Sequence, residues 1–406
     1  MNITDGVTLE RIREAYGPLK PVVRRTPLLT SRTLDGMAGG PIHLKAENLQ
    51  KTGSFKIRGA YTALSRLSPA DRAQGVVTAS AGNHAQGIAL AAKLTGIQAR
   101  VFMPIGASIA KVLATRGYGA DVQLAGGSFD EAVAAAEGSA KQTGAPFISA
   151  FDHDDIITGQ GSVALELLED LPDLDTVLIP VGGGGLIGGM AIALKETKPS
   201  IRVIGVQAEG CSAAVESWRA GSVVAASQAK TIADGIAVKK PSARTLHYMK
   251  KYVDEMVTVT DEEIATTIVT LLERMKILVE GAGATALTAL IARKAAPKGC
   301  TAVVLSGGNI DIKLLEGLIE RAMLKSGRYV RLFTACEDRP GGLAGLLRSV
   351  AEARGNVIEV IHNRTSAAVP IGHTGVEILI ETRDSAHIDD LLARLKSAGY
   401  PVQLMS

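Results

Sequence analysis

Short apolar runs alternate with alanine-rich stretches through the first half of the chain. The apolar runs predict buried strands at residues 75–79, 99–103, 121–124, 146–148, 176–181 and 202–207. The stretches between them predict helices at residues 85–95, 128–143, 159–168 and 186–196, and one more that ends at residue 116. This alternation predicts an α/β protein with parallel sheets covered by helices on both faces. Ligands of such folds bind outside the carboxyl ends of the strands.

The two ends of the chain follow different patterns. Residues 8–31 predict a helical segment that becomes extended near Pro27, and a strand at 41–47 and a helix at 57–67 follow. Residues 325–328 predict a linker. Beyond it lie predicted strands at 329–336, 356–364, 376–382 and 401–404 and helices at 343–354 and 386–398. Their order, β-α-β-β-α-β, is typical of a small ferredoxin-like unit.

Composition and charge narrow the class of protein. The chain has 406 residues, enough for two or three domains, and a net charge of +3 without a basic stripe. One Trp and six Phe give few platforms for stacking bases, so we expect no nucleic-acid partner. No secretory signal pattern and no membrane-spanning apolar run occurs, which predicts a cytoplasmic protein. Cys211, Cys300 and Cys336 are widely spaced and predict neither a disulfide framework nor a zinc site.

The first candidate for chemistry is Lys56, in the stretch SFKIRGA at residues 54–60. Phe55 and Ile57 flank it, and partial desolvation would lower the pKa of its amine and make it a better nucleophile and base. Most of the 44 Lys and Arg residues are expected to be solvated surface charges. Lys56 therefore needs partners elsewhere in the chain.

Three predicted loops, each after a strand, could supply those partners. Residues 80–87 (SAGNHAQG) form a turn that enters a helix, whose N–H groups can hold a carboxylate or a phosphate. Four glycines at 182–185 precede Leu186 and a helix, which indicates a phosphate held by bare N–H groups. Residues 306–309 (SGGN) follow a predicted strand at 301–305 and place a hydroxyl at its end. Taken singly, the first and third loops could also be ordinary turns, and the glycine loop could be a merely flexible one.

A second interpretation of the glycine loop is a dinucleotide site. Residues 183–188 satisfy G-x-G-x-x-G, and Glu209 follows the next strand, where a ribose-binding acid belongs. This pattern is typical of a nicotinamide-dependent dehydrogenase. It leaves Lys56 and Asn83 without a role.

Together, the four motifs in this order and spacing resemble the pyridoxal-phosphate enzymes of the tryptophan-synthase β fold, and within them the threonine dehydratases. The resemblance covers residues 8–325. It implies the fold-type II arrangement, with a smaller parallel-sheet subdomain at about 54–155 inserted into a larger one, and a catalytic domain at 1–325. Residues 326–406, with EDRPGGL at 337–343, resemble a ferredoxin-like ACT regulatory domain.

The resemblance also implies roles for single residues. Lys56 would hold the cofactor covalently, and Phe55 would pack near its ring. Asn83 would bind the ring hydroxyl, and Ser306 would face the ring nitrogen. The phosphate would be held by the glycine loop, at Gly182, Gly183, Gly184, Gly185 and Leu186. The substrate carboxylate would bind at Ser80, Ala81, Gly82, Asn83 and His84, with Ser80 counted among the catalytic residues.

The implied reaction is the dehydration and deamination of L-threonine to 2-oxobutanoate and ammonia, and of L-serine to pyruvate. Lys56 would act as the base at Cα, and the cofactor phosphate is the expected proton donor to the leaving hydroxyl. A serine racemase-like enzyme is a further alternative. However, such racemases carry a second serine where this chain has Ala81. They also bind a divalent cation through acids after the strand at 202–207, where this chain reads QAEGCSA, so we expect no metal.

The ACT-like unit implies regulation. Such domains pair between chains and bind small amino acids, so a homodimer or homotetramer is expected. The effector, isoleucine or valine, would bind at Asp338, Arg339, Pro340, Gly341 and Gly342. An oligomerisation module without a ligand is the alternative.

Overall fold

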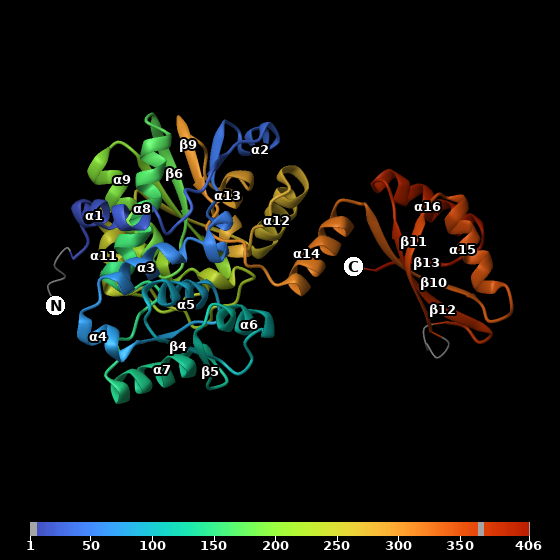
Figure 1. The fold of residues 1–406 in the computed structure, drawn as a ribbon. Helices are drawn as coiled ribbons and strands as arrows, with labels where there is room; N and C mark the ends of the chain where they lie inside the picture. The colour runs from blue at the N-terminus through green and yellow to red at the C-terminus, as the bar shows by residue number, and fades with distance from the viewer. Residues whose placement is uncertain (1–5, 364–368, 406) are drawn as a thin grey trace. The chain divides into compact units, whose positions relative to one another are not determined.

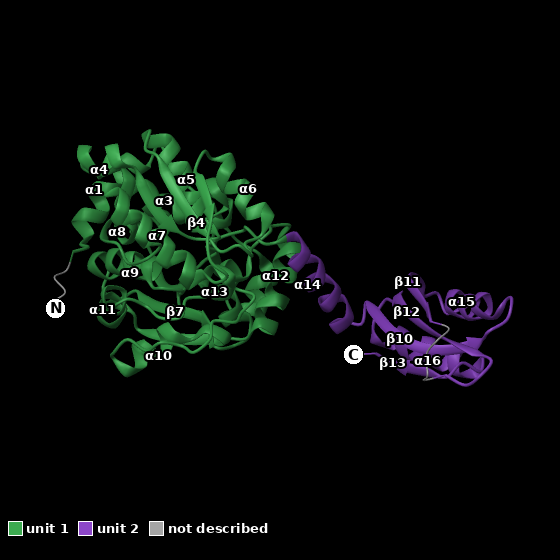
Figure 2. Ribbon diagram, turned by 90° about the horizontal axis from the view of Figure 1, so that it is seen from below, with its two compact units in different colours: residues 1–311 green, residues 312–406 purple. Residues whose placement is uncertain are grey.

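The computed structural model describes residues 6–363 and 369–405. The chain divides into two compact units, residues 1–311 and 312–406 (Figure 2). The first unit holds both parallel sheets and the second an antiparallel sheet. The predicted α/β class with a separate C-terminal unit is therefore confirmed. Within the described residues, no helix has the length and apolarity needed to cross a membrane.

The larger sheet of the first unit has six strands in the order β1-β2-β9-β6-β7-β8. Their bounds are Leu28–Leu29, Ile42–Lys45, Cys300–Val304, Leu174–Pro180, Arg202–Ala208 and Glu255–Val259. All neighbours are parallel except the short β1, which pairs antiparallel with β2. The carboxyl ends of β9, β6 and β7 thus lie at the same edge of the sheet.

The smaller sheet of the first unit is parallel, in the order β3 (Val76–Ala79), β4 (Ala99–Met103) and β5 (Asp121–Leu124). Helix α5 (Asn83–Thr95) covers one face and α7 (Phe129–Thr143) the other (Figure 1). The predicted strand at 146–148 is reduced to a single bridge between Phe147 and Val77.

The remaining helices of the first unit lie on and between the sheets. They are α1 (Leu9–Leu19), α2 (Arg32–Ala38), α3 (Lys56–Ser65), α4 (Pro69–Gln74), α6 (Ile109–Gly117), α8 (Asp154–Asp170), α9 (Gly185–Thr197), α10 (Ala213–Ala220), α11 (Ala243–Tyr252), α12 (Asp261–Met275) and α13 (Gly281–Ile291). The predicted helix at 8–31 ends at Leu19, close to Pro21, which has no N–H to donate to the next helical hydrogen bond. Helix α8 starts earlier than predicted, since the His153 ring caps it by accepting from the Asp155 N–H.

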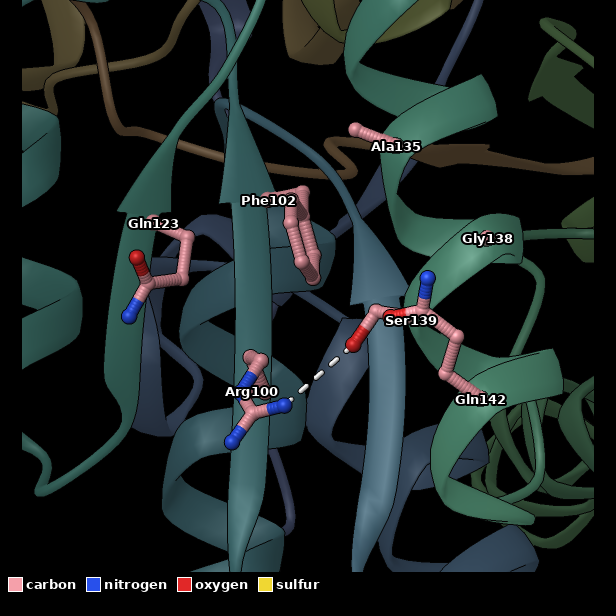
Figure 3. A pocket seen from close by; sticks show the side chains of 7 residues that line it. All are labelled: Arg100, Phe102, Gln123, Ala135, Gly138, Ser139 and Gln142. Carbon is pink, nitrogen blue, oxygen red and sulfur yellow. Dashed lines mark hydrogen bonds between the residues drawn. The ribbon is translucent and has the colours of Figure 1, made fainter.

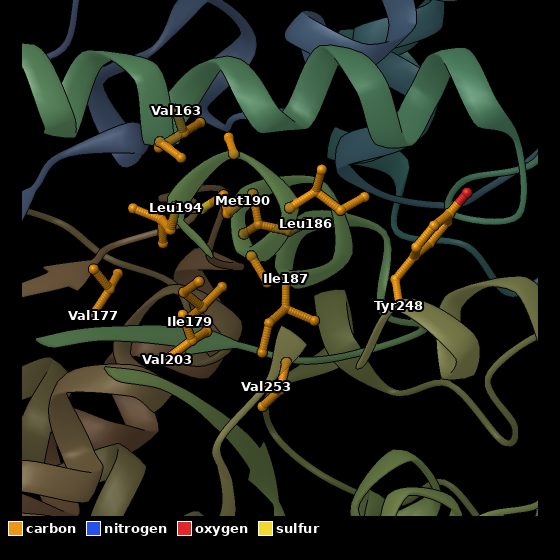
Figure 4. Packing of buried hydrophobic residues seen from close by; sticks show 14 of the residues in the cluster. Val163, Val177, Ile179, Leu186, Ile187, Met190, Leu194, Val203, Tyr248 and Val253 are labelled. Atoms are coloured by element: carbon orange, nitrogen blue, oxygen red, sulfur yellow. The ribbon is translucent and has the colours of Figure 1, made fainter. Parts of the chain in front are cut away.

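The core of the larger sheet centres on α9 (Figure 4). Ile187, Met190 and Leu194 of this helix are fully buried, with Val177 of β6 and Val203 of β7 in the same cluster. A helix that is apolar all round must be buried on every side. Helices α8 and α9 approach so closely at Gly189 that a Cβ there would lie 2.1 Å from the Ile157 carbonyl oxygen. This packing fixes the start of α9, where the glycine loop ends.

The second unit consists of α14 (Ile312–Lys325), β10 (Tyr329–Glu337), α15 (Gly342–Glu352), β11 (Asn356–Asn363), β12 (His373–Glu381), α16 (Ser385–Ser397) and β13 (Val402–Leu404). Its antiparallel sheet has the order β11-β12-β10-β13, and α15 and α16 contribute to its core. The predicted β-α-β-β-α-β arrangement is confirmed. Arg364, the predicted end of one strand, lies outside the described residues.

The second compact unit begins at Ile312 rather than at the predicted domain boundary of 326. Helix α14 belongs to it because this helix contacts β10 and is tied to it by an ion pair of 2.8 Å between Glu320 and Arg331.

Candidate active site

The lysine segment lies against the SGGN loop. The Phe55 N–H donates to the Ser306 carbonyl oxygen at 3.2 Å, and Ser54 pairs with Gly307 in an antiparallel bridge. Because the SGGN loop follows β9, these contacts hold the start of α3 at the carboxyl edge of the larger sheet.

Lys56 is the first residue of α3. Its Nζ donates to the Ala150 carbonyl oxygen at 3.1 Å and lies 5.1 Å from the centre of the Phe55 ring. Burial lowers the pKa of the Lys56 ammonium to about 8, and the Glu280 carboxylate partly opposes this shift. An amine with such a pKa is in part neutral at pH 7 and can act as a nucleophile or a base.

Asn83 is the first residue of α5 and is buried. Its Nδ2 donates to Glu280 Oε1 at 2.6 Å, and its Oδ1 accepts from Asn309 Nδ2 at 2.7 Å. Helix α5 also passes close to the lysine, since a Cβ on Gly87 would lie 3.1 Å from the carbonyl carbon of Lys56. The second loop, the lysine helix and the SGGN loop therefore meet.

The turn before α5 borders open space. Ser80, Ala81 and Gly82 are half-buried, and a Cβ on Gly82 would meet no atom within 4 Å. Ser80 Oγ accepts from the Gly82 N–H at 3.2 Å, which keeps the hydroxyl on its own turn. The first turn of α5 leaves backbone N–H groups without helical partners. Such groups suit the carboxylate that the sequence predicts at this position, and the assignment stays a prediction.

His84 points into the protein. Its ring is buried, and Nε2 forms a hydrogen bond of 3.2 Å with the Ile148 carbonyl oxygen. Burial lowers the pKa of His84 to about 3, and the charge of Lys56 adds to the effect. The ring is therefore neutral, and the predicted contact with substrate is left to the backbone N–H of His84.

The glycine loop joins β6 to α9. A Cβ on Gly183 would lie 2.3 Å from the Phe151 ring, and Gly184 has a φ of +93°. Glycine at 183 avoids a clash with the Phe151 ring, and glycine at 184 tolerates the positive φ. The loop therefore presents backbone N–H groups, free of side chains, at the start of a helix, which is a place where anions bind. The Leu186 side chain is buried in the core, so only its backbone is available for a phosphate. Phe151 follows Ala150, which links this loop to Lys56.

Ser306 Oγ has one long hydrogen bond, of 3.4 Å, to the Ala282 carbonyl oxygen. The hydroxyl is buried and retains capacity for a second partner. Together with the glycine cradle and the half-buried Lys56 amine, it gives a donor set that fits pyridoxal phosphate: an amine, a phosphate site and a hydroxyl for a ring nitrogen.

Three residues near the site were not assigned roles by the sequence: Glu280, Asn309 and Phe151. Glu280 is a single acid directly before the small, apolar residues that open α13. An acid next to such an apolar stretch is the sequence feature that could have marked it as a buried site residue. Asn309 lies within the SGGN motif. Phe151 carries no local signal, since the packing that gives it a role is tertiary.

A separate groove lies on the outer side of the smaller sheet (Figure 3). Its volume is about 580 Å³, and its lining consists of Arg100, Phe102, Gln123, Ala135, Gly138, Ser139 and Gln142. None of these is a candidate site residue. Across the described part of the chain, no group of three His, Cys, Asp or Glu side chains is arranged to hold a metal ion.

The predicted effector residues lie in the second unit, between β10 and α15. Residues 338–341 are exposed, and Gly341, at the start of α15, has a φ of +92°. The Asp338 N–H donates to the Gly372 carbonyl oxygen at 2.9 Å. The loop is thus a helix start open to solvent, and its role as an effector site stays a prediction.

Comparison with known proteins agrees with this donor set. Residues 19–307 match the family described as "Pyridoxal-phosphate dependent enzyme". The chain is 48% identical over 399 residues to "L-threonine ammonia-lyase" of Thermotoga maritima, covering 98% of this chain and 100% of that protein. The chain therefore belongs to the pyridoxal-phosphate dependent enzymes, and among them to the family of the L-threonine ammonia-lyases.

Solved structures show the same fold. The processed form of threonine deaminase isoform 2 from Solanum lycopersicum has a TM-score of 0.73 at 34% identity, covering 77% of this chain and 93% of its own. Maize serine racemase has a TM-score of 0.74 at 34% identity, covering 79% and 99%. The family match includes the glycine loop, so this loop belongs to a pyridoxal-phosphate enzyme and not to a dinucleotide fold.

Proposed function

We propose that this protein converts L-threonine to 2-oxobutanoate and ammonia, and L-serine to pyruvate and ammonia, with pyridoxal phosphate as cofactor. The observation that carries this proposal is the Lys56 amine. It is half-buried, has a lowered pKa, and lies where the loops at 80–83, 182–186 and 306–309 converge. The likeness to L-threonine ammonia-lyase along nearly the whole chain supports the choice of substrate.

The proposed roles follow from the donor set. The backbone N–H groups of residues 183–186 would bind the cofactor phosphate, Asn83 its ring oxygen and Ser306 its ring nitrogen. The turn at Ser80–Gly82 and the first turn of α5 would bind the substrate carboxylate. The Lys56 amine would hold the cofactor and then be released beside the substrate.

When bound, pyridoxal phosphate withdraws electrons from the substrate Cα and makes its proton acidic. The neutral Lys56 amine would remove that proton, and the β-hydroxyl would leave as water after taking up a proton, for which the cofactor phosphate is the expected donor. A serine hydroxyl at 306 does not keep a ring nitrogen charged as a carboxylate would, which favours elimination over transamination or racemisation. The released enamine hydrolyses to the 2-oxo acid and ammonia. Ala81 has no hydroxyl to act as a base on the opposite face, which also argues against a racemase.

The proposal is tested by measuring both the colour of the bound cofactor and the products released from each substrate. The purified protein should be yellow and should release 2-oxobutanoate from L-threonine and pyruvate from L-serine. The D enantiomers should be inert. A colourless protein, or interconversion of L- and D-serine faster than pyruvate release, would contradict it.

We further propose that the second unit binds isoleucine or valine at residues 338–342 and pairs two or more chains. The exposed start of α15 offers N–H groups for an amino-acid carboxylate. Isoleucine should change the threonine saturation curve, and Gly342→Leu should abolish this response, since a Cβ there would lie 2.2 Å from the Glu337 carbonyl oxygen. Sedimentation would give the oligomeric state. An unchanged isoleucine response in Gly342→Leu would contradict the assignment.

A further inference from the structure

Glu280 is a buried acid that the proposed mechanism does not use. It immediately precedes α13, yet its side chain makes no capping hydrogen bond to that helix. Instead Oε1 accepts from Asn83 Nδ2 at 2.6 Å, although 197 residues separate the two in sequence. Only 3% of Glu280 is exposed, so this contact is screened from water.

The hydrogen bonds of Asn83 distinguish the two ends of its amide. The Thr52 carbonyl oxygen can only accept, which fixes the Asn309 amide nitrogen beside it and the Asn83 oxygen opposite that nitrogen. The Asn83 atom that faces Glu280 is therefore the amide nitrogen. On the other side, Asn83 Oδ1 accepts from Asn309 Nδ2 at 2.7 Å, and the same nitrogen donates to the Thr52 carbonyl oxygen at 2.7 Å. The amide nitrogen of Asn83 carries two hydrogens, and Glu280 takes one. Among residues 6–363 and 369–405, no second acceptor for this nitrogen is recorded.

The Glu280 carboxylate lies in the space that a side chain at Gly307 would occupy. A Cβ on Gly307 would lie 2.2 Å from Glu280 Oε1 and 3.1 Å from Asn83 Nδ2. The Glu280 N–H also donates to the Gly307 carbonyl oxygen at 3.1 Å. The first glycine of the SGGN motif therefore lets Glu280 reach Asn83.

Groups that raise and groups that lower the pKa of Glu280 surround it, and the rise prevails. Burial raises the pKa of Glu280 to about 7, and Asp234 adds to the rise. Hydrogen bonds from the Asn83 amide and the Asn309 backbone, and the charge of Lys111, oppose it. Lys111 is itself ion-paired with Asp234.

From this geometry we propose that Glu280 is a positioning residue that orients the Asn83 amide and leaves its second N–H for the ring oxygen of the cofactor. The inference rests on the proposed function, because it takes Asn83 as the partner of that oxygen. Glu280 itself touches neither cofactor nor substrate in this account. Its main effect on cofactor binding should therefore pass through Asn83, beside its charge, which also raises the pKa of Lys56.

The test is a double-mutant cycle on cofactor binding. Apoprotein of wild type, Glu280→Ala, Asn83→Ala and the double variant is titrated with pyridoxal phosphate, and the visible absorption of the bound cofactor is followed against pH. Glu280→Ala should weaken binding about tenfold, as expected for one hydrogen bond to a charged group, and should shift the pH at which the absorption changes. The double variant should bind as Asn83→Ala does. Glu280→Gln, whose oxygen can still accept, should remain within about threefold of wild type.

A second experiment leaves the Glu280 carboxylate in place and changes the glycine beside it. Gly307→Ala should displace Glu280 Oε1 and weaken cofactor binding when Asn83 is present, but have little further effect in Asn83→Ala. Gly36→Ala, in α2, is the matched control, since a Cβ there meets no atom within 4 Å. Glu255→Ala, an acid paired with Arg202 at the surface, controls for loss of a carboxylate.

Two results would overturn the inference. One is wild-type cofactor binding and absorption in both Glu280→Ala and Gly307→Ala. The other is additive losses in the double variant, which would show that Glu280 acts independently of Asn83. The proposed function fails differently: wild-type protein would bind pyridoxal phosphate but release no 2-oxobutanoate from L-threonine, and the cycle on binding would still be readable.

Discussion

Two cations on helix α3 have opposite surroundings. Arg58 is fully buried and lies between two carboxylates, with Nη2 2.8 Å from Glu47 Oε1 and Nη1 2.7 Å from Glu166 Oε1. Lys45 joins the same group at 2.7 Å from Glu166 Oε2. Lys56, two residues before Arg58, has a backbone carbonyl oxygen as its hydrogen-bond partner.

The pKa values of the two side chains follow from this difference. Burial alone would lower the pKa of Arg58, but Glu47 and Glu166 raise it. Burial lowers the pKa of Lys56 to about 8, because Glu280 opposes the shift only in part. Burial with counter-ions thus keeps a cation charged and anchors the helix, whereas burial without them yields a reactive amine.

The largest effect is expected at Lys56. Lys56→Ala should lower the turnover of L-threonine by about 10³-fold or more, because both the cofactor link and the base are lost. The measurement is the rate of 2-oxobutanoate release at saturating cofactor. Lys93→Ala, an exposed lysine on α5, is the control and should retain full activity. Comparable turnover in both variants would contradict the role of Lys56.

Removing the charge of Arg58 should mainly lower the free energy of unfolding. Arg58→Met leaves Glu47 and Glu166 buried with Lys45 as their remaining cation, and should lower the free energy of unfolding by about 3–5 kcal/mol. Urea unfolding followed by circular dichroism measures this. A loss below about 1 kcal/mol would show that the group does not depend on Arg58 for its charge balance.

The amine of Lys56 should give cofactor attachment a distinctive pH dependence. At pH 7 a lysine with a pKa of about 8 is roughly one-tenth neutral, about 300 times more than one at the ordinary 10.5. The rate at which apoprotein takes up pyridoxal phosphate should therefore rise with pH and level off above about 8. Stopped-flow absorbance measures the rate. A rate that continues to rise to pH 10 would indicate an amine with an ordinary pKa.

The smallest effect is expected where charges are paired at the surface. Arg25 contacts Glu169 at 2.5 Å and also Asp170, and about half of its side chain is exposed. Arg25→Ala should lower the free energy of unfolding by less than about 1 kcal/mol, because solvent screens the pair. The same urea measurement applies. A loss as large as that of Arg58→Met would mean that burial does not account for the difference.

The sequence predicted the elements whose pattern is local. Strands β6 and β7 lie inside a parallel sheet and read as continuous apolar runs, and both were found. Residues 208–300 contain α10 to α13 and β8, none of which was predicted. β8 lies at the sheet edge and is only partly buried, and α13 is apolar all round, so neither shows a clear period. For α12 a signal was present, since Thr260 and Glu263 form a capping box.

For the candidate site too, the sequence predicted the residues that lie in local motifs and missed those brought in by tertiary packing. Lys56, Asn83, the glycine loop and Ser306 lie in contiguous motifs, and the structure brings these motifs together. Glu280 and Ala150 reach the site only through tertiary packing, at 197 and 94 residues from their hydrogen-bond partners. No local pattern marks such a contact.

The most direct test of the contrast on α3 is to identify the lysine that holds the cofactor. Borohydride reduction of the yellow protein, followed by peptide mapping, would fix the cofactor on its lysine. We predict one label per chain, on Lys56, and none on Lys45, which is more deeply buried and is paired with Glu166. A label on Lys45 or on any other lysine, or no stable label after reduction, would contradict the account.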